Sequence, residues 1–310
     1  THMAKKIQTA VPTEALDKDR FSTLNLGPTH PATHGIFQNV LKMDGEIILD
    51  AEPTIGYIHR AFEKLAERSP YAQITPITDR LNYCSSPINN MGWYMTVEKL
   101  LGASLPKRAE YHRVIIMELS RIADHIICNT IIGQDTGATT GFLYLFQFRE
   151  HIYDIFESIC GARLTTNIGR IGGFDREWSA ETWAKINDFI ARFPQALNEF
   201  NSLLERNRIF MDRTINCGPI SAERALAYSF TGPNLRAAGV DYDVRVAQPY
   251  SSYADFEFSI PVGSQGDTYD RFTVRQEEMR QSLSIIKQAI AKLPSGAMHA
   301  DLPDFYLPPK

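Results

Sequence analysis

The stretch PKRAEYHRVIIMELSRIADHIICNTIIG, residues 106–133, decides the fold of this chain. Its apolar side chains, from Val114 to Ile127, recur at the spacing of one broad helical face, which is typical of an inner helix of a bundle. Pro106 suits the first turn of that helix, because its φ is already helical and its missing N–H would have no partner there. The stretch also carries Glu118, Arg121, Asp124 and His125. These side chains exclude a membrane span, which needs about 20 largely apolar residues, so any work at a membrane would be that of a peripheral subunit.

Further amphipathic stretches predict a mainly helical body around this central helix. Ser179 can cap a helix that begins at residue 180, with Glu181 favourably placed in the first turn. Pro194 should kink or break that helix, because proline removes a hydrogen bond and its ring clashes with the preceding turn. The expected helices cover residues 58–68, 87–101 (ending at Gly102), 142–160 (ending at Gly161), 180–206 and 270–293, and residues 71–83 are expected to be a turn-rich passage that contains a helical segment.

The N-terminal part has a different periodicity and predicts a small β-sheet. Residues 21–26 alternate in polarity and read as a strand, and two apolar runs between Phe37 and Pro53 are separated by Asp44-Gly45. That dipeptide is a strong hairpin signal and predicts a type I′ turn. We therefore expect an α+β fold, mainly α with a small N-terminal β element. Its parts are a tag remnant and flexible arm over 1–20, the β element over 21–56 and a helical body over 57–310.

The loop GPTHPATHG, residues 27–35, follows the first strand and carries two histidines. Pro28 and Pro31 lack amide donors and fix φ, so the loop should be stiff and not helical. Two imidazoles in a stiff loop suit proton or hydrogen-bond donation; the alternative is a tight turn whose histidines bond nearby backbone. A metal site at His30 and His34 is disfavoured, because a four-residue spacing puts two imidazoles on one face only in a helix.

Asp135 lies in a loop of small residues, at the point where the central helix is expected to end. A histidine needs a partner to set its tautomer, and that partner is most often a carboxylate or a carbonyl. Asp135 is therefore a candidate orienting group for a histidine in a cleft, or else an ordinary solvated loop residue.

The composition bounds the class of protein. The chain has 310 residues, 44% of them hydrophobic, and a net charge of −4, which gives no case for nucleic acid, because such partners need a basic face. The glycine-rich segment at 167–175 lacks G-x-G-x-x-G spacing, so dinucleotide binding is not expected. The four cysteines lie far apart and form no C-x-x-C pair: Cys84, Cys128, Cys160 and Cys217. We therefore expect no zinc or iron–sulfur ligands in this chain, and a reducing compartment.

A second polar segment, TDRLNYCSSP at residues 78–87, precedes the helix predicted over 87–101. The phenol of Tyr83 can donate to a carbonyl oxygen, since the ordinary pKa of tyrosine is about 10 and the proton is present at neutral pH. The alternative is a core tyrosine whose hydroxyl is satisfied within the protein. Cys84 is not expected to be a nucleophile, because no cysteine–histidine signature surrounds it.

Several stretches along the chain together carry a specific resemblance. They are LNLGPTHPATHG (24–35), IGYIHRAFEKL (55–65), DRLNY (79–83), VEKLLG (97–102), ELSRIADH (118–125), NIGRIGG (167–173), LRAAGVDYDVR (235–245) and residues 270–289. From about residue 21 onward the chain resembles the hydrogenase-like subunit of respiratory complex I that forms the quinone site of this proton-pumping NADH:quinone oxidoreductase. Members of that family continue further, so we expect this chain to be truncated at its C-terminus and inactive when isolated.

The resemblance implies a fold related to the large subunit of nickel–iron hydrogenases, with a helical bundle at its centre. It implies that His34 and Tyr83 bind a quinone headgroup and donate protons or hydrogen bonds during its reduction. Asp135 is then the carboxylate that orients His34. Arg60 and Arg80 are implied to lie near a terminal Fe–S cluster that a neighbouring subunit holds.

The resemblance also implies where the chain works and with which partners. It binds no cofactor of its own; quinone is the substrate, and NADH feeds electrons to the complex. The implied partners are the other peripheral-arm subunits, above all the terminal-cluster subunit, and the membrane-arm subunits. We expect a peripheral position on the cytoplasmic side of a bacterial inner membrane. Within the histidine loop, His30 and Gly35 are expected to be supporting residues.

Two departures from the family pattern bear on these expectations. Many members carry a histidine where this chain has Thr165 or Thr166, and that histidine makes the cluster potential depend on pH. Threonine predicts a lower, less pH-dependent potential, which suits a low-potential quinone such as menaquinone. Asn82 stands where many members have aspartate, which removes one charge beside Tyr83.

Two alternatives remain at this point. A nickel–iron hydrogenase large subunit needs two paired-cysteine motifs to hold its metals, and the segment around Cys84 has no such pair. A non-catalytic scaffold or assembly subunit would need no chemistry of its own.

Overall fold

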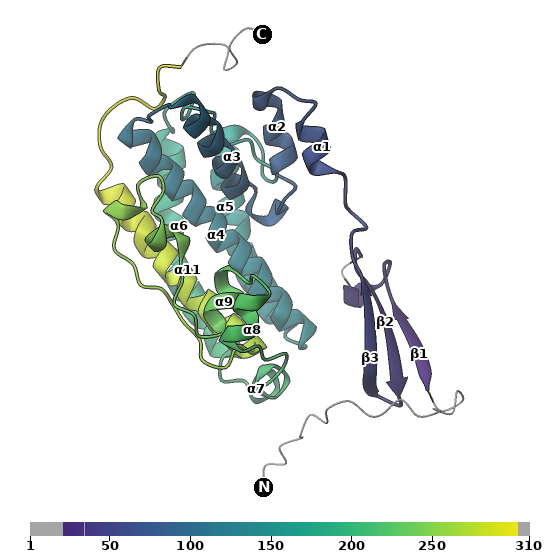
Figure 1. Ribbon diagram of the computed structural model, residues 1–310. Coiled ribbons are helices and arrows are strands. Elements are labelled where there is room, and N and C mark those ends of the chain that lie inside the picture. Colours follow the sequence, from purple (N-terminus) through teal and green to yellow (C-terminus); the bar gives the residue numbers. More distant parts are fainter. Residues whose placement is uncertain (1–20, 34, 303–310) are drawn as a thin grey trace. The chain divides into compact units, whose positions relative to one another are not determined.

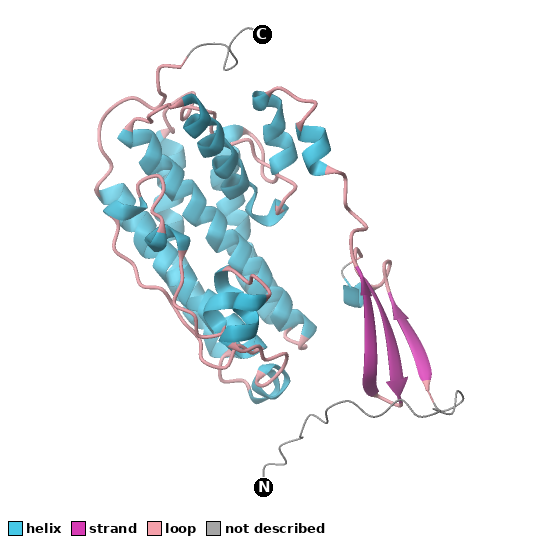
Figure 2. Ribbon diagram, in the orientation of Figure 1, coloured by secondary structure: helices cyan, strands magenta, loops and turns pink. Residues whose placement is uncertain are grey.

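The computed structural model describes residues 21–33 and 35–302, and the chain divides between Arg68 and Ser69 into two compact units (Figure 1). The first unit holds an antiparallel sheet of order β1-β2-β3, which Figure 2 shows together with its short helices. Its elements are β1 (Ser22–Leu26), η1 (Pro31–Thr33), β2 (Gln38–Asp44), β3 (Ile47–Thr54) and α1 (Phe62–Ala66). The predicted small N-terminal sheet is therefore confirmed.

The hairpin between β2 and β3 is present, but its turn differs from the predicted one. Asp44 pairs with Ile47, so the two turn residues are Gly45 and Glu46 rather than Asp44 and Gly45. Gly45 has a φ of +62°, whereas Glu46 is not among the residues with positive φ. A type I′ turn requires positive φ at both central residues, and a type II′ turn requires it only at the first, where glycine is preferred. The predicted type I′ turn is thus wrong, because the register places the glycine one position earlier in the turn.

The loop between β1 and β2 depends on a glycine at its first position. Gly27 has a φ of +102°, and a Cβ atom built on it would lie 2.0 Å from the carbonyl oxygen of Phe37. Any other residue would strain the backbone and collide with the strand that the loop leads into. The only helical turn in the described part of this loop is η1, so the expectation of an irregular, non-helical loop holds apart from one 3₁₀ turn.

The second unit is a helical bundle built around α4 (Lys107–Asp135). This helix packs against α11 (Thr268–Ala291), α5 (Thr139–Cys160) and α3 (Ser86–Leu101), and α5 packs in turn against α6 (Ala180–Leu204) (Figure 1). Most of the apolar face predicted for α4 is buried in the core, including Val114, Ile115, Leu119, Ile122 and Ile126, whereas Ile127 is partly exposed. The mainly helical fold class is confirmed, and the stretch at 106–133 does form its central helix.

Several helix ends lie where the sequence places them. Gly102 and Gly161 follow α3 and α5 in the left-handed conformation, and the Ser179 hydroxyl accepts a hydrogen bond from the backbone N–H of Thr182. Pro106 precedes α4 as its N-cap residue instead of occupying its first turn.

The sequence predicts that Pro194 kinks or breaks its helix. No break occurs, and α6 runs through Pro194 as one helix. Phe189 and Phe193 before the proline, and Leu197 and Phe200 after it, are each at most 1% exposed. Proline removes one backbone hydrogen bond, which destabilises the helix. Burial of the same apolar face on both sides of the proline stabilises the continuous helix by more.

The remaining elements of the second unit are short. They are α2 (Tyr71–Thr78), η2 (Tyr83–Ser85), α7 (Arg208–Thr214), α8 (Ala222–Ala227), α9 (Gly232–Ala237), α10 (Val244–Ala247) and η3 (Tyr253–Asp255). None of the helices formed by the described residues has both the length and the apolarity that crossing a membrane requires.

Candidate functional site

Tyr83 lies at the first position of η2, the turn that leads from α2 into α3. Its side chain is half-exposed, with 51% of the residue surface accessible. Among the described residues, nothing hydrogen-bonds its hydroxyl. A phenol in this setting can donate to a ligand outside the chain, and the alternative of a core tyrosine is excluded by its exposure.

The residue before Tyr83 fixes the turn. The Asn82 side-chain oxygen accepts from the backbone N–H of Cys84 at 3.3 Å, and its amide Nδ2 donates to the Ser85 hydroxyl at 2.6 Å. The same Nδ2 atom also donates to Asp124 Oδ1, at 3.1 Å, and so ties the turn to α4. Asn82 therefore joins the Tyr83 turn to the central helix of the bundle.

Asp124 is half-buried, with 32% of its side chain exposed. Burial by itself raises the pKa of this carboxyl, but the neighbouring His125 and the hydrogen bond from Asn82 outweigh burial and lower the pKa below its ordinary value. Asp124 is thus an anionic acceptor at neutral pH, which strengthens the hydrogen bond from the Asn82 amide.

His125 carries the connection from α4 to α11. Its Nε2 atom lies 2.6 Å from Glu278 Oε2, and its Nδ1 atom lies 3.9 Å from Asp124 Oδ2. Glu278 also accepts from Arg236 Nε, at 2.7 Å. These two partners overcome the effect of burial, which alone would raise the pKa of Glu278, and hold that pKa well below its usual range.

The ion pairs continue through the interior of the bundle. Arg236 lies 3.7 Å from Asp243, Arg245 pairs with Asp243 at 2.7 Å, and Arg245 also lies 3.1 Å from Glu118. We call this set the buried ionic network: Glu118, Arg121, His125, Arg236, Asp243, Arg245 and Glu278. It connects α4, α9, α10 and α11.

Glu118 is fully buried at one end of this network. Burial alone would raise the pKa of Glu118, but the Arg121 and Arg245 guanidinium groups hold it at about 2. The hydroxyl of Tyr253 donates to Glu118 Oε1 at 2.5 Å. Buried charges of this kind are tolerated only when each has a partner.

A separate buried cluster joins the Tyr83 segment to the loop that contains Thr165 and Thr166. The Asn90 amide Nδ2 donates to Asp79 Oδ1 and to the Thr166 carbonyl, each at 2.8 Å, and the Thr78 hydroxyl donates to Asn90 Oδ1. Burial raises the pKa of Asp79. The structure therefore brings together two segments that are about 80 residues apart in the sequence.

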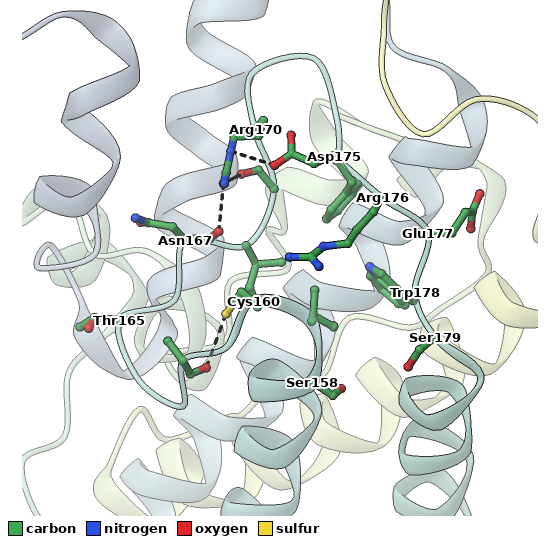
Figure 3. Close-up of a pocket in the computed structure, with 15 residues that line it drawn as sticks. Ser158, Cys160, Thr165, Asn167, Arg170, Asp175, Arg176, Glu177, Trp178 and Ser179 are labelled. Carbon is green, nitrogen blue, oxygen red and sulfur yellow. Dashed lines mark hydrogen bonds and ion pairs between the residues drawn. The ribbon is translucent and has the colours of Figure 1, made fainter.

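Thr165 has a φ of +52°, a conformation that β-branched residues rarely adopt. It lines a cavity of about 360 Å³, whose wall also includes Cys160, Arg170 and Trp178 (Figure 3). Arg170 is paired there with Asp175 at 3.2 Å. Strained backbone of this kind is found most often at functional sites.

The other predicted site residues are divided between the two units. Arg80 is exposed just after α2, and Asp135 is the exposed last residue of α4. Asp135 lies about 16 Å along the axis of α4 from Asp124, because each helical residue advances about 1.5 Å. Thus Arg80 and Tyr83 share one segment, whereas Asp135 comes from the far end of the central helix.

The first unit contains His30, Gly35 and Arg60, and His34 lies outside the described residues. The carbonyl of His30 accepts from the N–H and the hydroxyl of Thr33, both at 3.0 Å, and its Nδ1 accepts from the Ala32 N–H at 3.1 Å. His30 therefore bonds nearby backbone, as a residue that supports its own loop would do.

From the sequence, Asp124 and His125 served to exclude a membrane span. The sequence did not predict that Asp124 joins α4 to the Tyr83 turn or that His125 joins α4 to α11. The available signal was their position: ionisable side chains within the most apolar stretch of a chain are costly to bury without partners. Their partners are Asn82, which is 42 residues from Asp124, and Glu278 of α11, which is 153 residues from His125, so spacing alone could not reveal them.

No group of three or more histidine, cysteine, aspartate and glutamate side chains within residues 21–33 and 35–302 is arranged to hold a metal ion. In this described part the four cysteines are free thiols.

Comparison with known proteins decides the family. The model of the family described as "Respiratory-chain NADH dehydrogenase, 49 Kd subunit" matches residues 135–310. The D subunit of the NADH-quinone oxidoreductase of Flavobacterium johnsoniae is 71% identical over 295 residues, which are 95% of this chain and 72% of that protein. The chain belongs to this family.

Other relatives agree with this assignment. One of the NADH-quinone oxidoreductase D subunits of Cytophaga hutchinsonii is 69% identical over 95% of this chain and 76% of its own length. The corresponding D subunit of Leptospira biflexa is 55% identical over 93% of this chain and 71% of its own length. The chain is therefore a subunit of an NADH-quinone oxidoreductase complex, and the other subunits of complex I are its partners.

Proposed function

We propose that this chain forms part of the site at which the complex reduces quinone, and that Tyr83 binds the quinone headgroup together with His34. The observation that carries the proposal is the setting of Tyr83. Its phenol is half-exposed, on a turn that Asn82 fixes to Ser85 and Asp124. The relatives are described as NADH-quinone oxidoreductases, so a quinone is the acceptor that such a donor would meet.

The chemistry requires donors at both ends of the headgroup. Reduction of a quinone to a quinol consumes two electrons and two protons, and a terminal Fe–S cluster held by a neighbouring subunit supplies the electrons. Negative charge develops on each quinone oxygen, and a positioned donor stabilises that charge and delivers the proton. In this proposal Tyr83 donates to one oxygen and His34 to the other, with Asp135 orienting the His34 imidazole.

The remaining assignments follow the resemblance and are part of the same proposal. The β element over 21–56 carries the His34 loop, and the helical body over 57–310 carries the Tyr83 turn. Arg60 and Arg80 face the terminal cluster of the neighbouring subunit. The chain works in the peripheral arm, next to the membrane-arm subunits, on the cytoplasmic side of a bacterial inner membrane.

Thr165 or Thr166 at the position of the family histidine leads us to propose a low-potential quinone such as menaquinone. Threonine has no group that titrates near neutral pH, so the midpoint potential of the terminal cluster should change little with pH. A redox titration of the intact complex at several pH values tests this, and a steep dependence of the potential on pH would contradict it.

The proposed quinone site is tested by Tyr83→Phe and His34→Ala in the intact complex. NADH oxidation by ferricyanide, an acceptor that does not need the quinone site, reports assembly and electron entry. We expect both variants to keep that rate and to lose quinone reduction. If both keep the wild-type rate of quinone reduction while assembly is normal, the chain is a scaffold subunit and the proposal is wrong.

A further inference from the structure

The hydrogen bonds of Asn82 are local with one exception. Its side-chain oxygen accepts from Cys84, its Nδ2 donates to Ser85, and its carbonyl accepts from Asn89 Nδ2 at 3.0 Å. Asp124 is the one partner in this set that lies outside the segment 82–89, and it belongs to the central helix. Within this set, Asp124 is therefore the hydrogen-bond partner that joins the Tyr83 turn to the central helix.

Tyr83 depends on this contact because its own side chain supplies no anchor. Its hydroxyl makes no hydrogen bond within the described residues, and the ring is half-exposed. Tyr83 is bonded directly to Asn82 in the chain, so a shift of Asn82 moves the phenol with it. Displacement of a reacting group by about 1 Å can lower a rate by about 100-fold.

The anchor lies on a helix that is packed tightly into the bundle. Asp124 is one residue before His125, whose Nε2 atom is fixed at 2.6 Å from Glu278 of α11, inside the buried ionic network. The helices α4 and α11 pack along each other through the bundle (Figure 1). Asp124 therefore presents its carboxylate from a part of the structure that has little freedom to move.

We propose that Asp124 is a positioning residue for quinone reduction, which acts by holding Asn82 and, through Asn82, the phenol of Tyr83. This inference rests on the proposed function of Tyr83. An amide donates to a carboxylate without a proton that it could lose, so the contact persists at every pH at which Asp124 is ionised.

The chemistry of the pair provides a specific test. Asn82→Asp keeps the acceptor for the Cys84 N–H but places a carboxylate against Asp124, so that the two must share a proton to stay in contact. Asp124→Asn in the same chain restores one amide and one carboxylate with their positions exchanged. The titratable and charged groups that face Asp124 and this turn are Cys84 of η2, His125 and Cys128 of α4, Arg149 of α5 and Arg275 of α11.

The measurement is the turnover number (kcat) for quinone reduction by the intact complex, normalised to NADH oxidation by ferricyanide, between pH 6 and pH 8.5. We expect N82D to lower kcat at pH 8 by about tenfold or more, and to lose less as the pH falls and the two carboxylates come to share a proton. The double variant N82D/D124N should recover at pH 8, and D124N alone, which keeps an acceptor, should lose less than N82D. The matched control is D188N, which replaces an exposed aspartate on α6. Its kcat should equal that of the wild type.

A wild-type kcat for N82D at pH 8, or a double variant no faster than N82D, overturns the inference. If N82D fails to assemble, Asp124→Ala replaces it: kcat should fall by about tenfold with an unchanged pH profile, and an unchanged kcat overturns the inference. A different result would contradict the proposed function of Tyr83. If Tyr83→Phe keeps the wild-type rate, the quinone role of Tyr83 is wrong, whereas a loss in Tyr83→Phe without one in N82D removes only the role of Asp124.

Discussion

His125 Nε2 of α4 lies 2.6 Å from Glu278 Oε2 of α11, and both side chains are buried. This pair joins the two long helices at the centre of the bundle, and it lies one residue from the carboxylate that anchors the Tyr83 turn. The buried ionic network therefore lies next to the turn that carries Tyr83, where we propose that quinone binds.

Glu278→Leu should destabilise the chain strongly. The substitution leaves Arg236 as a buried charge without its closest partner, and breaking a buried ion pair from one side costs about 3–5 kcal/mol. Urea unfolding of the chain measures this change. The matched control is Asp188→Leu, which removes an exposed pair with Arg192 and should change the unfolding free energy by about 0.5 kcal/mol or less.

The free energy of unfolding should fall at acidic pH, and part of that fall should come from protonation of Glu118. Its folded pKa, about 2, is below the ordinary value of about 4.3. Glu118 therefore contributes stability that is present above about pH 5 and is lost as the pH falls towards 2; the shift is equivalent to about 3 kcal/mol.

The variant E118Q separates this contribution from that of other carboxyls. The difference in unfolding free energy between the wild type and E118Q should narrow by about 3 kcal/mol as the pH falls from 6 to 2. A difference that stays constant over this range would show that the Glu118 carboxyl is not held ionised by Arg121 and Arg245.

Gly27→Ala should disrupt the sheet of the first unit. The added Cβ would lie 2.0 Å from the Phe37 carbonyl oxygen at a φ of +102°. Gly45→Ala is the control, because a Cβ there meets nothing within 4 Å and only the φ of +62° is unfavourable; its cost should be about 1–2 kcal/mol. Hydrogen exchange of the β1 and β2 amides should accelerate more in Gly27→Ala than in Gly45→Ala, and equal exchange in the two variants would contradict the close contact.

Thr165→Asn should stabilise the chain by about 0.5–1 kcal/mol in thermal or urea unfolding. Asparagine tolerates the left-handed conformation seen at Thr165, whereas a β-branched residue does not. Thr96→Asn, at an exposed position in α3, is the comparison and should change stability by less than about 0.5 kcal/mol. A destabilised Thr165→Asn variant would mean that the backbone at 165 is not strained.

The long helices of the second unit and their order could be predicted because each depends on a local pattern: the apolar face of 106–133, the glycines at 102 and 161, and the cap at Ser179. The break considered at Pro194 was wrong because burial of the phenylalanines on either side overrides a local rule. The turn at Gly45 was misassigned for a similar reason, since strand register decides which residues are central.

The site was predictable in part. The sequence singled out Tyr83, and the structure places it half-exposed on a fixed turn. The connection from Asn82 to Asp124, and from His125 to Glu278, could not be inferred, because the partners are 42 and 153 residues apart. Contacts of this separation depend on how the helices pack, which a single sequence does not encode in any local pattern.

The most direct test of the central claim is the kcat for quinone reduction by Tyr83→Phe in the intact complex, at saturating quinone and with the ferricyanide rate as the measure of assembly. The phenylalanine ring keeps the shape of the side chain and removes only the donor, so the account predicts that kcat falls by about 100-fold or more while the ferricyanide rate is unchanged. A variant that reduces quinone at the wild-type rate would contradict it.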